Sequence, residues 1–185
     1  MRMIADARRL EIYAVGHYGA VASDAQFKFL RVGVSAVAYT DPRLQTLSAN
    51  LLRPDDVVLI ISSSGRIAEL LAVAEAAQER GAKVVAITES QSPLARKADL
   101  ALIVDHVEDI ATQVPMISRI LHLLMVDILV VGVTLHRGTS VPALGSDATM
   151  GLDEVAPGQT NAGARRKAPG VSAAGTLAHL TSHSR

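Results

Sequence analysis

The feature that most restricts the fold of this chain is an uninterrupted apolar run at residues 57–62 (VVLIIS), which leads into a serine-rich turn. A strand that is apolar on both faces must be covered on both sides, as in the centre of a parallel sheet. Apolar side chains then recur at helical spacing over residues 67–80, and Gly81 ends this helix. A second apolar strand follows at residues 83–88. This order predicts a parallel sheet with helices on both faces.

The same alternation continues on both sides of this unit. We expect further strands at residues 9–15, 34–39 and 100–104, and helices at residues 20–31, 44–52, 93–97 and 112–136. The fold class is therefore α/β, a three-layer αβα sandwich in which helices flank a parallel sheet of about five strands. The most apolar stretch, residues 120–135, is shorter than the roughly 20 residues that a membrane span needs, and we interpret it as a buried helix.

Composition divides the chain and excludes several function classes. Residues 139–185 are rich in Gly, Ala, Ser, Thr and Pro, so we expect one folded domain at residues 1–138 and a mostly disordered tail at 139–185. The 18 basic and 18 acidic residues give no net charge, which argues against a broad surface for nucleic acid or an anionic membrane. Without cysteine, disulfides and a cysteine nucleophile are excluded, and the histidines show no metal-ligand spacing. We expect no metal and no cofactor.

The serine-rich turn, residues 62–65 (SSSG), is the strongest candidate for a binding site. It follows a parallel strand at the edge of the sheet where ligands bind, and the next helix presents unpaired N–H groups and its positive dipole end. The hydroxyls of Ser62, Ser63 and Ser64 add donors, and Gly65 lets an anion approach the backbone. These groups form a phosphate cradle that needs no lysine. In a simpler interpretation, Ser64 only caps the helix.

A second loop with two glycines, residues 16–20 (GHYGA), follows the first strand. Gly16 and Tyr18 lie just before a helix, where a loop can also face a phosphate. The loop contains neither the dinucleotide-binding glycine pattern nor a Walker lysine pattern. A tight turn between strand and helix explains the same residues.

Four stretches in a fixed order link the chain to a known family. They are IYAVG with DAQFKFLRVG, VVLIISSSGRIAELLAVAEAAQERGAKVVAIT, SPLARKADLAL and PMISRILHLLMVDILVVGV. In these stretches, which cover about residues 9–138, the chain resembles the sugar isomerase (SIS) domain, and closely the sugar-sensing half of RpiR/HexR-type transcription regulators. The resemblance implies a flavodoxin-like sheet, a phosphosugar ligand and pairing into homodimers.

The resemblance also gives roles to loop residues. The family's serine loop, S-x-S-G-x-T, holds the phosphate, and here Ile67 stands in place of its threonine. Tyr18 stands in the first loop where the family often has a serine or threonine. The ligand-binding candidates are Gly16, Tyr18, Ser62, Ser63, Ser64, Gly65 and Ile67. The implied ligand is a sugar phosphate or a phosphorylated sugar acid, and HexR-like members sense 2-keto-3-deoxy-6-phosphogluconate.

An isomerase would also need a base within reach of the ligand. The candidate bases are His17, Glu69, Glu89, Glu108, Asp109 and His122. Because these residues form no persuasive acid–base pair, we assign no catalytic residue and expect a regulatory domain that senses a phosphosugar of carbohydrate metabolism. An SIS-class sugar-phosphate isomerase or lyase is the alternative, and a dimerisation module without a ligand is a third possibility.

Partners and location follow from the same comparison. RpiR/HexR regulators bind DNA through an N-terminal helix-turn-helix, whereas this chain has about eight residues before its first strand, so we expect DNA binding only through a head that the chain does not contain. Some members of the family are fused behind a glucokinase. Apolar residues of the last helix exceed what one sheet covers and predict a homodimer: Ile120, Leu124, Ile128 and Val131. We expect a cytoplasmic protein with no membrane partner.

Overall fold

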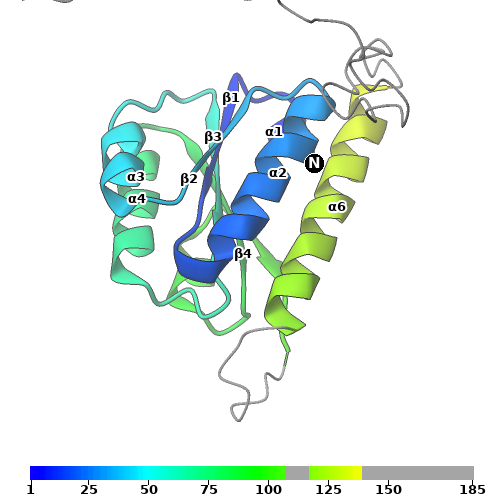
Figure 1. The fold of residues 1–185 in the computed structure, drawn as a ribbon. Coiled ribbons are helices and arrows are strands. Elements are labelled where there is room, and N and C mark those ends of the chain that lie inside the picture. The colour runs from blue at the N-terminus through cyan, green and yellow to red at the C-terminus, as the bar shows by residue number, and fades with distance from the viewer. Residues whose placement is uncertain (107–116, 139–185) are drawn as a thin grey trace, which may run out of the picture. The chain divides into compact units, whose positions relative to one another are not determined.

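The computed structural model describes residues 1–106 and 117–138, and its centre is a parallel sheet (Figure 1). The strands are β1 (Arg9–Tyr13), β2 (Ala36–Tyr39), β3 (Asp56–Ile61), β4 (Lys83–Thr88) and β5 (Leu100–Ile103). They are hydrogen-bonded in the order β2-β1-β3-β4-β5, and every pair is parallel. This is the flavodoxin-like, doubly wound order, in which the direction of winding reverses between β1 and β3. The predicted fold class and sheet are confirmed.

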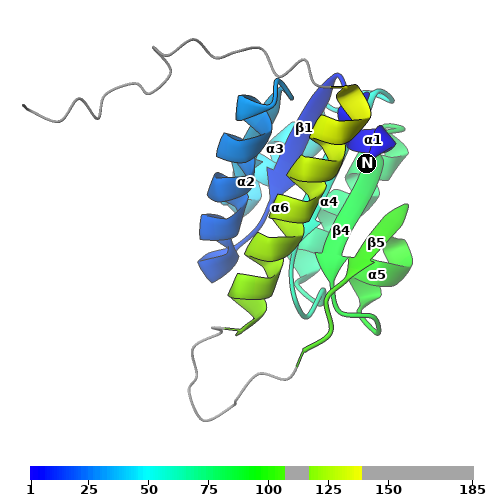
Figure 2. The same ribbon diagram turned by 90° about the vertical axis from the view of Figure 1, so that its right-hand side faces the viewer.

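Helices cover both faces of the sheet (Figures 1 and 2). One face carries α1 (Arg2–Ala5), α2 (Gly19–Arg31) and α6 (Ile117–Arg137), and the other carries α3 (Pro42–Ala49), α4 (Ala68–Glu79) and α5 (Pro93–Lys97). A short 3₁₀ helix, η1 (Gly16–Tyr18), joins β1 to α2. The α1 helix was not expected from the sequence, since four residues are too few to show a helical period.

Two hydrophobic cores lie on the two faces of the sheet, and successive side chains of a strand point into one core and then the other. In β3, Val57, Leu59 and Ile61 pack in the core under α2 and α6. Val58 and Ile60 point to the opposite core under α3 and α4. All five are at most 3 % exposed, and burial of each stabilises the fold by about 1.5–3 kcal/mol. The apolar run therefore forms a strand that is buried on both faces, as predicted.

Capping residues set several boundaries. Ser92, the N-cap residue of α5, accepts a hydrogen bond at 2.9 Å from the backbone N–H of Ala95. The α3 helix begins two residues earlier than predicted, because the Asp41 carboxylate accepts from the N–H groups of Arg43 (2.8 Å) and Leu44 (3.1 Å). The first strand ends at Tyr13 rather than at residue 15.

The α6 helix is amphipathic, and the prediction that it is buried is wrong for its outer face. The residues of its inner face are Ser118, His122, Val126, Leu129 and Val133. Six large apolar residues on its outer face are 46–76 % exposed: Ile117, Ile120, Leu124, Ile128, Val131 and Leu135. We call these six the α6 ridge. In the part of the chain that is described, α6 is also the one helix whose length and composition would suit a membrane span.

Arg137, the last residue of α6, ties three parts of the chain together. Its guanidinium donates to the carbonyl oxygen of Ala5, at 3.0 Å from Nε and 2.7 Å from Nη2. Nη1 donates to the carbonyl of Gly33 at 2.8 Å and to that of Val32 at 3.3 Å. The end of α1 and the turn after α2 are thereby fastened to the end of α6.

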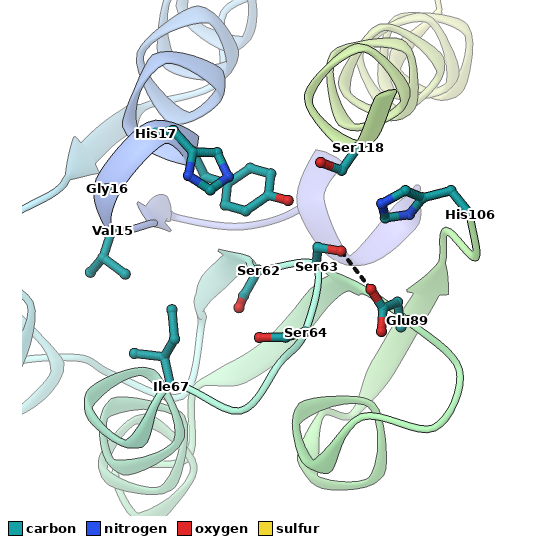
Figure 3. Close-up of a pocket in the computed structure, with 11 residues that line it drawn as sticks. Val15, Gly16, His17, Ser62, Ser63, Ser64, Ile67, Glu89, His106 and Ser118 are labelled. Carbon is teal, nitrogen blue, oxygen red and sulfur yellow. Dashed lines mark hydrogen bonds between the residues drawn. The ribbon is translucent and has the colours of Figure 1, made fainter. Parts of the chain in front are cut away.

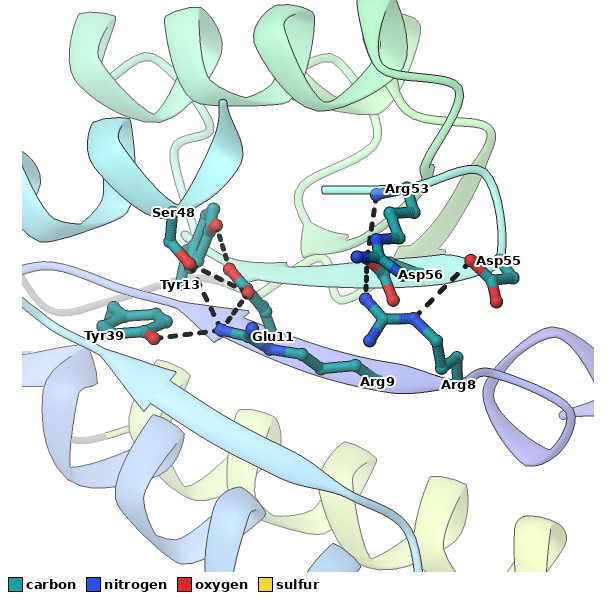
Figure 4. A network of polar contacts seen from close by, with 9 residues as sticks. All are labelled: Arg8, Arg9, Glu11, Tyr13, Tyr39, Ser48, Arg53, Asp55 and Asp56. Atoms are coloured by element: carbon teal, nitrogen blue, oxygen red, sulfur yellow. Dashed lines mark hydrogen bonds and ion pairs between the residues drawn. The ribbon is translucent and has the colours of Figure 1, made fainter. Parts of the chain in front are cut away.

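A polar network is built into the core between β1 and α3 (Figure 4). The Glu11 carboxylate, 1 % exposed, pairs with Arg9, accepts a hydrogen bond from Tyr13 and accepts another at 2.8 Å from Ser48 of α3. Burial, together with the Glu11 contact, raises the pKa of the Tyr13 hydroxyl, which stays a donor. Because the carboxylate is paired and hydrogen-bonded, the network tolerates burial and holds α3 against the sheet.

Some predictions lie outside the described residues. These are the expected start of the last helix at residues 112–116, the candidate bases Glu108 and Asp109, and the tail at residues 139–185.

Candidate functional site

A cavity of about 400 Å³ opens at the carboxyl ends of the strands, beside the point where the strand order reverses (Figure 3). Ligands of doubly wound sheets bind at this point, because the loops after β1 and β3 diverge there. The described residues that line the cavity are Val15, Gly16, His17, Tyr18, Ser62, Ser63, Ser64, Ile67, Glu89, His106 and Ser118. It thus brings together the two loops that the sequence marked as candidates.

The three serines differ in what their hydroxyls do. Ser62 Oγ accepts a hydrogen bond at 3.2 Å from the N–H of Gly65, which closes the turn. Ser63 Oγ donates to Oε1 of Glu89 at 2.7 Å. Ser64 is exposed, and its hydroxyl makes no hydrogen bond with a described residue. Ser64 is therefore the serine whose hydroxyl is available to a ligand.

The start of α4 has no side-chain cap. Its N-cap residue is Ile67, whose side chain cannot accept a hydrogen bond, so the interpretation of Ser64 as the cap is wrong. The first N–H of the helix that bonds within the helix is that of Leu71, to the carbonyl of Ile67 at 3.1 Å. The N–H groups before it point out of the helix end beside the cavity, together with the positive end of the dipole. Such an end accepts an anion.

Gly65 does not line the cavity, and the structure shows why this position needs glycine. Its φ is +55°, a left-handed conformation that costs other residues energy. A Cβ atom here would lie 2.6 Å from Thr88 Oγ1 and 2.7 Å from Ser92 Oγ. The glycine therefore permits the close packing of the serine loop against β4 and the start of α5.

The first loop contributes open space and an aromatic wall. Gly16 has a φ of +61°, and an added Cβ atom would meet nothing within 4 Å. The ring of Tyr18, 7 % exposed, lies 4.0 Å from the ring of His17 and 4.9 Å from that of His122. Tyr18 thus forms part of the cavity wall.

His122, a candidate base, is a buried side chain of the α6 inner face. It is 0 % exposed, and neither ring nitrogen has a hydrogen-bond partner among the described residues. Burial lowers the pKa of His122 to about 4, and the nearby His106 and His17 add to this effect. His122 is therefore neutral at pH 7, and it supports the cavity from behind Tyr18 without lining it.

The structure sorts the other candidate bases as well. Glu89 and His17 line the cavity, whereas Glu69 lies in the exposed first turn of α4 and does not. The sequence did not indicate His106 and Ser118 as site residues, because only the tertiary fold brings the end of β5 and the start of α6 to this cavity. The described residues include no group of three or more side chains that could hold a metal ion.

Comparisons with known proteins give consistent results. Residues 3–132 match the family model of the SIS domain. The chain is 51 % identical over 134 residues to the bifunctional protein Glk of Burkholderia orbicola, and 39 % identical over 136 residues to the HTH-type transcriptional regulator HexR of Pseudomonas aeruginosa. These matches cover 72 % and 74 % of the chain, but only 21 % of the Glk protein and 48 % of HexR. The chain thus spans about a fifth to a half of the length of these curated relatives.

Solved structures show the same fold. The Vibrio vulnificus NanR protein, determined in complex with ManNAc-6P, superposes with a TM-score of 0.67 at 25 % identity, over 73 % of this chain and 52 % of NanR. The sugar isomerase domain of an RpiR transcription factor from Sphaerobacter thermophilus gives a TM-score of 0.65 at 23 % identity, over 73 % of this chain and 74 % of that one.

Proposed function

Because the chain belongs to the SIS domain family, we propose that it is a phosphosugar-sensing regulatory domain of the RpiR/HexR type, acting in carbohydrate metabolism. The resemblance seen in the sequence is confirmed by the family match and by the 39 % identity to HexR. The ligand is a small sugar phosphate or phosphorylated sugar acid, and 2-keto-3-deoxy-6-phosphogluconate is the candidate that the resemblance names.

One observation carries this proposal: a helix end without a side-chain cap faces the cavity beside an unused serine hydroxyl. The N–H groups at the start of α4 and the Ser64 hydroxyl provide several donors for one phosphate group. Ser62 adds its hydroxyl proton, since its oxygen only accepts from Gly65. A dianion can bind here without lysine, because hydrogen bonds to a charged group are about twice as strong as neutral ones.

DNA binding requires a second part of the protein. The net charge of zero supports this division of roles, since the sensing domain itself carries no excess of basic residues. In the proposed regulator, the ligand biases the arrangement of two sensing domains and thereby the spacing of their DNA-binding heads. The similarity to Glk supports a second setting, in which the same domain forms part of a longer bifunctional protein.

The alternative function, a sugar-phosphate isomerase or lyase, is supported by one feature of the cavity. Glu89 and His17 line the same space as the serine loop, so a base lies near the proposed phosphate site. Conversion of sugar phosphates by the purified chain, lost in Glu89→Gln, would support this alternative over a sensor.

The α6 ridge supports the proposed homodimer. Its six residues follow spacings of three and four, so they form one continuous apolar stripe along the helix. A second copy would cover this stripe with an identical one around a two-fold axis. A lipid environment for α6 is disfavoured because its inner face packs in the core and Asp127 pairs with Lys28 of α2. We propose a soluble, cytoplasmic dimer.

The test is direct binding of sugar phosphates to the purified chain. A panel of hexose, hexitol and hexonate 6-phosphates is screened by thermal shift and then titrated by calorimetry. A ligand that binds only the folded state must raise the melting temperature.

Ser64→Ala should weaken binding by ~5- to ~150-fold, the equivalent of about 1–3 kcal/mol for a hydrogen bond to a charged group. Ser23→Ala, which removes an exposed hydroxyl on α2, is the matched control and should bind as the wild type does. Equal affinities for all three proteins would remove Ser64 from the site. The absence of binding by the whole panel at millimolar concentrations would refute the proposed function.

A further inference from the structure

Among the described residues that line the cavity, one carries a carboxylate: Glu89, beside the serine loop (Figure 3). Two hydrogen bonds fix its place: Ser63 Oγ donates to Oε1 at 2.7 Å, and the Glu89 N–H donates to the Ser63 carbonyl at 3.0 Å. The side chain is half-buried, and Oε2 accepts no hydrogen bond from a described residue. One carboxylate oxygen is thus held in position by the loop, while the other is available to a ligand.

The cavity has two chemically different ends. Ile67 marks the start of α4, and Figure 3 shows Ile67 and Glu89 on opposite sides of Ser62 and Ser64. Ser63 points away from α4, toward Glu89. With its phosphate at the start of α4, a ligand has room to extend its sugar carbons toward Glu89.

The basic side chains of the described lining are the histidines His17 and His106, so a second anionic group on the ligand meets no permanently charged partner among the described residues. Among the described residues that line the cavity there is no Lys or Arg. A ligand carboxylate at the far end of the cavity would meet the negative charge of Glu89, whereas a sugar hydroxyl would donate to it in a strong, charge-assisted hydrogen bond.

We propose that Glu89 determines the class of phosphosugar that this domain accepts. It selects sugar phosphates whose far end carries hydroxyl groups, and it rejects phosphorylated sugar acids. 2-Keto-3-deoxy-6-phosphogluconate, an acid, is then a poor ligand for this chain. The inference rests on the proposed function, since it requires a phosphate at the start of α4.

The test compares two ligands that differ at one carbon. Glucitol 6-phosphate and gluconate 6-phosphate are both open chains, with a terminal hydroxymethyl group in one and a carboxylate in the other. Mannitol 6-phosphate and mannonate 6-phosphate form a second such pair. Calorimetric titrations are run at pH 8, where histidine side chains contribute little positive charge. The proteins are the wild type, Glu89→Gln, Ser63→Ala and, as a charge control, Glu79→Gln at the exposed far end of α4.

The wild type should bind the alcohol of at least one pair about tenfold more tightly than the matching acid, the effect expected of one nearby like charge. Glu89→Gln should abolish this preference, whereas Ser63→Ala and Glu79→Gln, which keep the Glu89 charge, should retain it. Wild-type protein that binds the acid of both pairs as tightly as the matching alcohol, or a preference that survives in Glu89→Gln, overturns the inference alone. The absence of binding of all four ligands overturns the proposed function and this inference with it.

Discussion

Substitution of the buried His122 by phenylalanine should remove an acid-sensitive part of the protein's stability. The folded state holds the pKa of His122 at about 4, whereas a histidine in the unfolded chain has a pKa near 6.5. As the pH falls below 6.5, the unfolded chain takes up a proton that the folded state refuses. The contribution is therefore fully present above pH 6.5 and is lost progressively down to about pH 4.

The size of this effect follows from the pKa difference. One pKa unit corresponds to 1.36 kcal/mol, so the full loss is about 3 kcal/mol, of which roughly 2 kcal/mol falls between pH 7 and pH 5. In His122→Phe the ring can still pack against Tyr18, but no proton binds. The variant's free energy of unfolding should therefore fall less than that of the wild type as the solution is acidified.

Urea unfolding at pH 8, 7, 6 and 5 measures the difference between the two proteins at each pH. Carboxylates titrate in both proteins, and their contribution cancels in this difference. His136→Phe, at an exposed position near the end of the same helix, is the matched control and should follow the wild type. Parallel curves for wild type and His122→Phe would refute the assignment of a neutral, unpartnered imidazole to this site.

Three further predictions concern single positions. Ile67→Thr supplies the missing N-cap of α4 and should raise the free energy of unfolding by about 0.5–2 kcal/mol relative to Ile67→Val. Valine is the control because it has the shape of threonine without the hydroxyl. Equal urea midpoints for the two variants would contradict the assignment of Ile67 as the N-cap residue. Gly65→Ala should lower the free energy of unfolding by about 1–3 kcal/mol more than Gly16→Ala does, because both positions have positive φ but only at Gly65 would the added Cβ collide with Thr88. Equal losses for the two variants in urea unfolding would contradict this packing. Leu124→Glu on the α6 ridge should give a monomer in sedimentation at micromolar concentration. The control Leu47→Glu, at a position that is 63 % exposed on α3, should sediment as the wild type does. A Leu124→Glu protein that still forms dimers would exclude this helix as the interface.

The sequence predicted the parts of the fold in which a local signal coincides with the tertiary structure. The strand at residues 83–88 was placed correctly, because an apolar run is bounded by Gly81 with its φ of +82° and by the Ser92 cap of the next helix. The first strand was predicted too long: it ends at Tyr13, although Ala14 is as buried as a strand residue and its N–H still donates to the Tyr39 carbonyl at 3.4 Å. An apolar run in the sequence indicates which residues are buried, and burial continues past the end of a strand. The run therefore does not mark where the strand ends.

The candidate site was predictable only in part, for a related reason. Residues 62–64 and 16–18 each lie directly after a strand, and the rule that parallel strands end at one edge brings them together. His106 and Ser118 reach the cavity from the end of β5 and the start of α6, and no local pattern marks them. The role of Ser64 as a cap was a reasonable local inference. It failed because the loop runs on to Ile67 before α4 begins.

The contacts of Arg137 set a practical limit on shortening this protein. An expression boundary placed a few residues earlier would leave most of α6 in place and would look harmless in the sequence. It would, however, delete the only side chain among the described residues that donates to the carbonyl groups of Ala5 and Gly33. The first helix would then lose its fastening, and proteolysis near Met1 would report the damage before any change in the sheet.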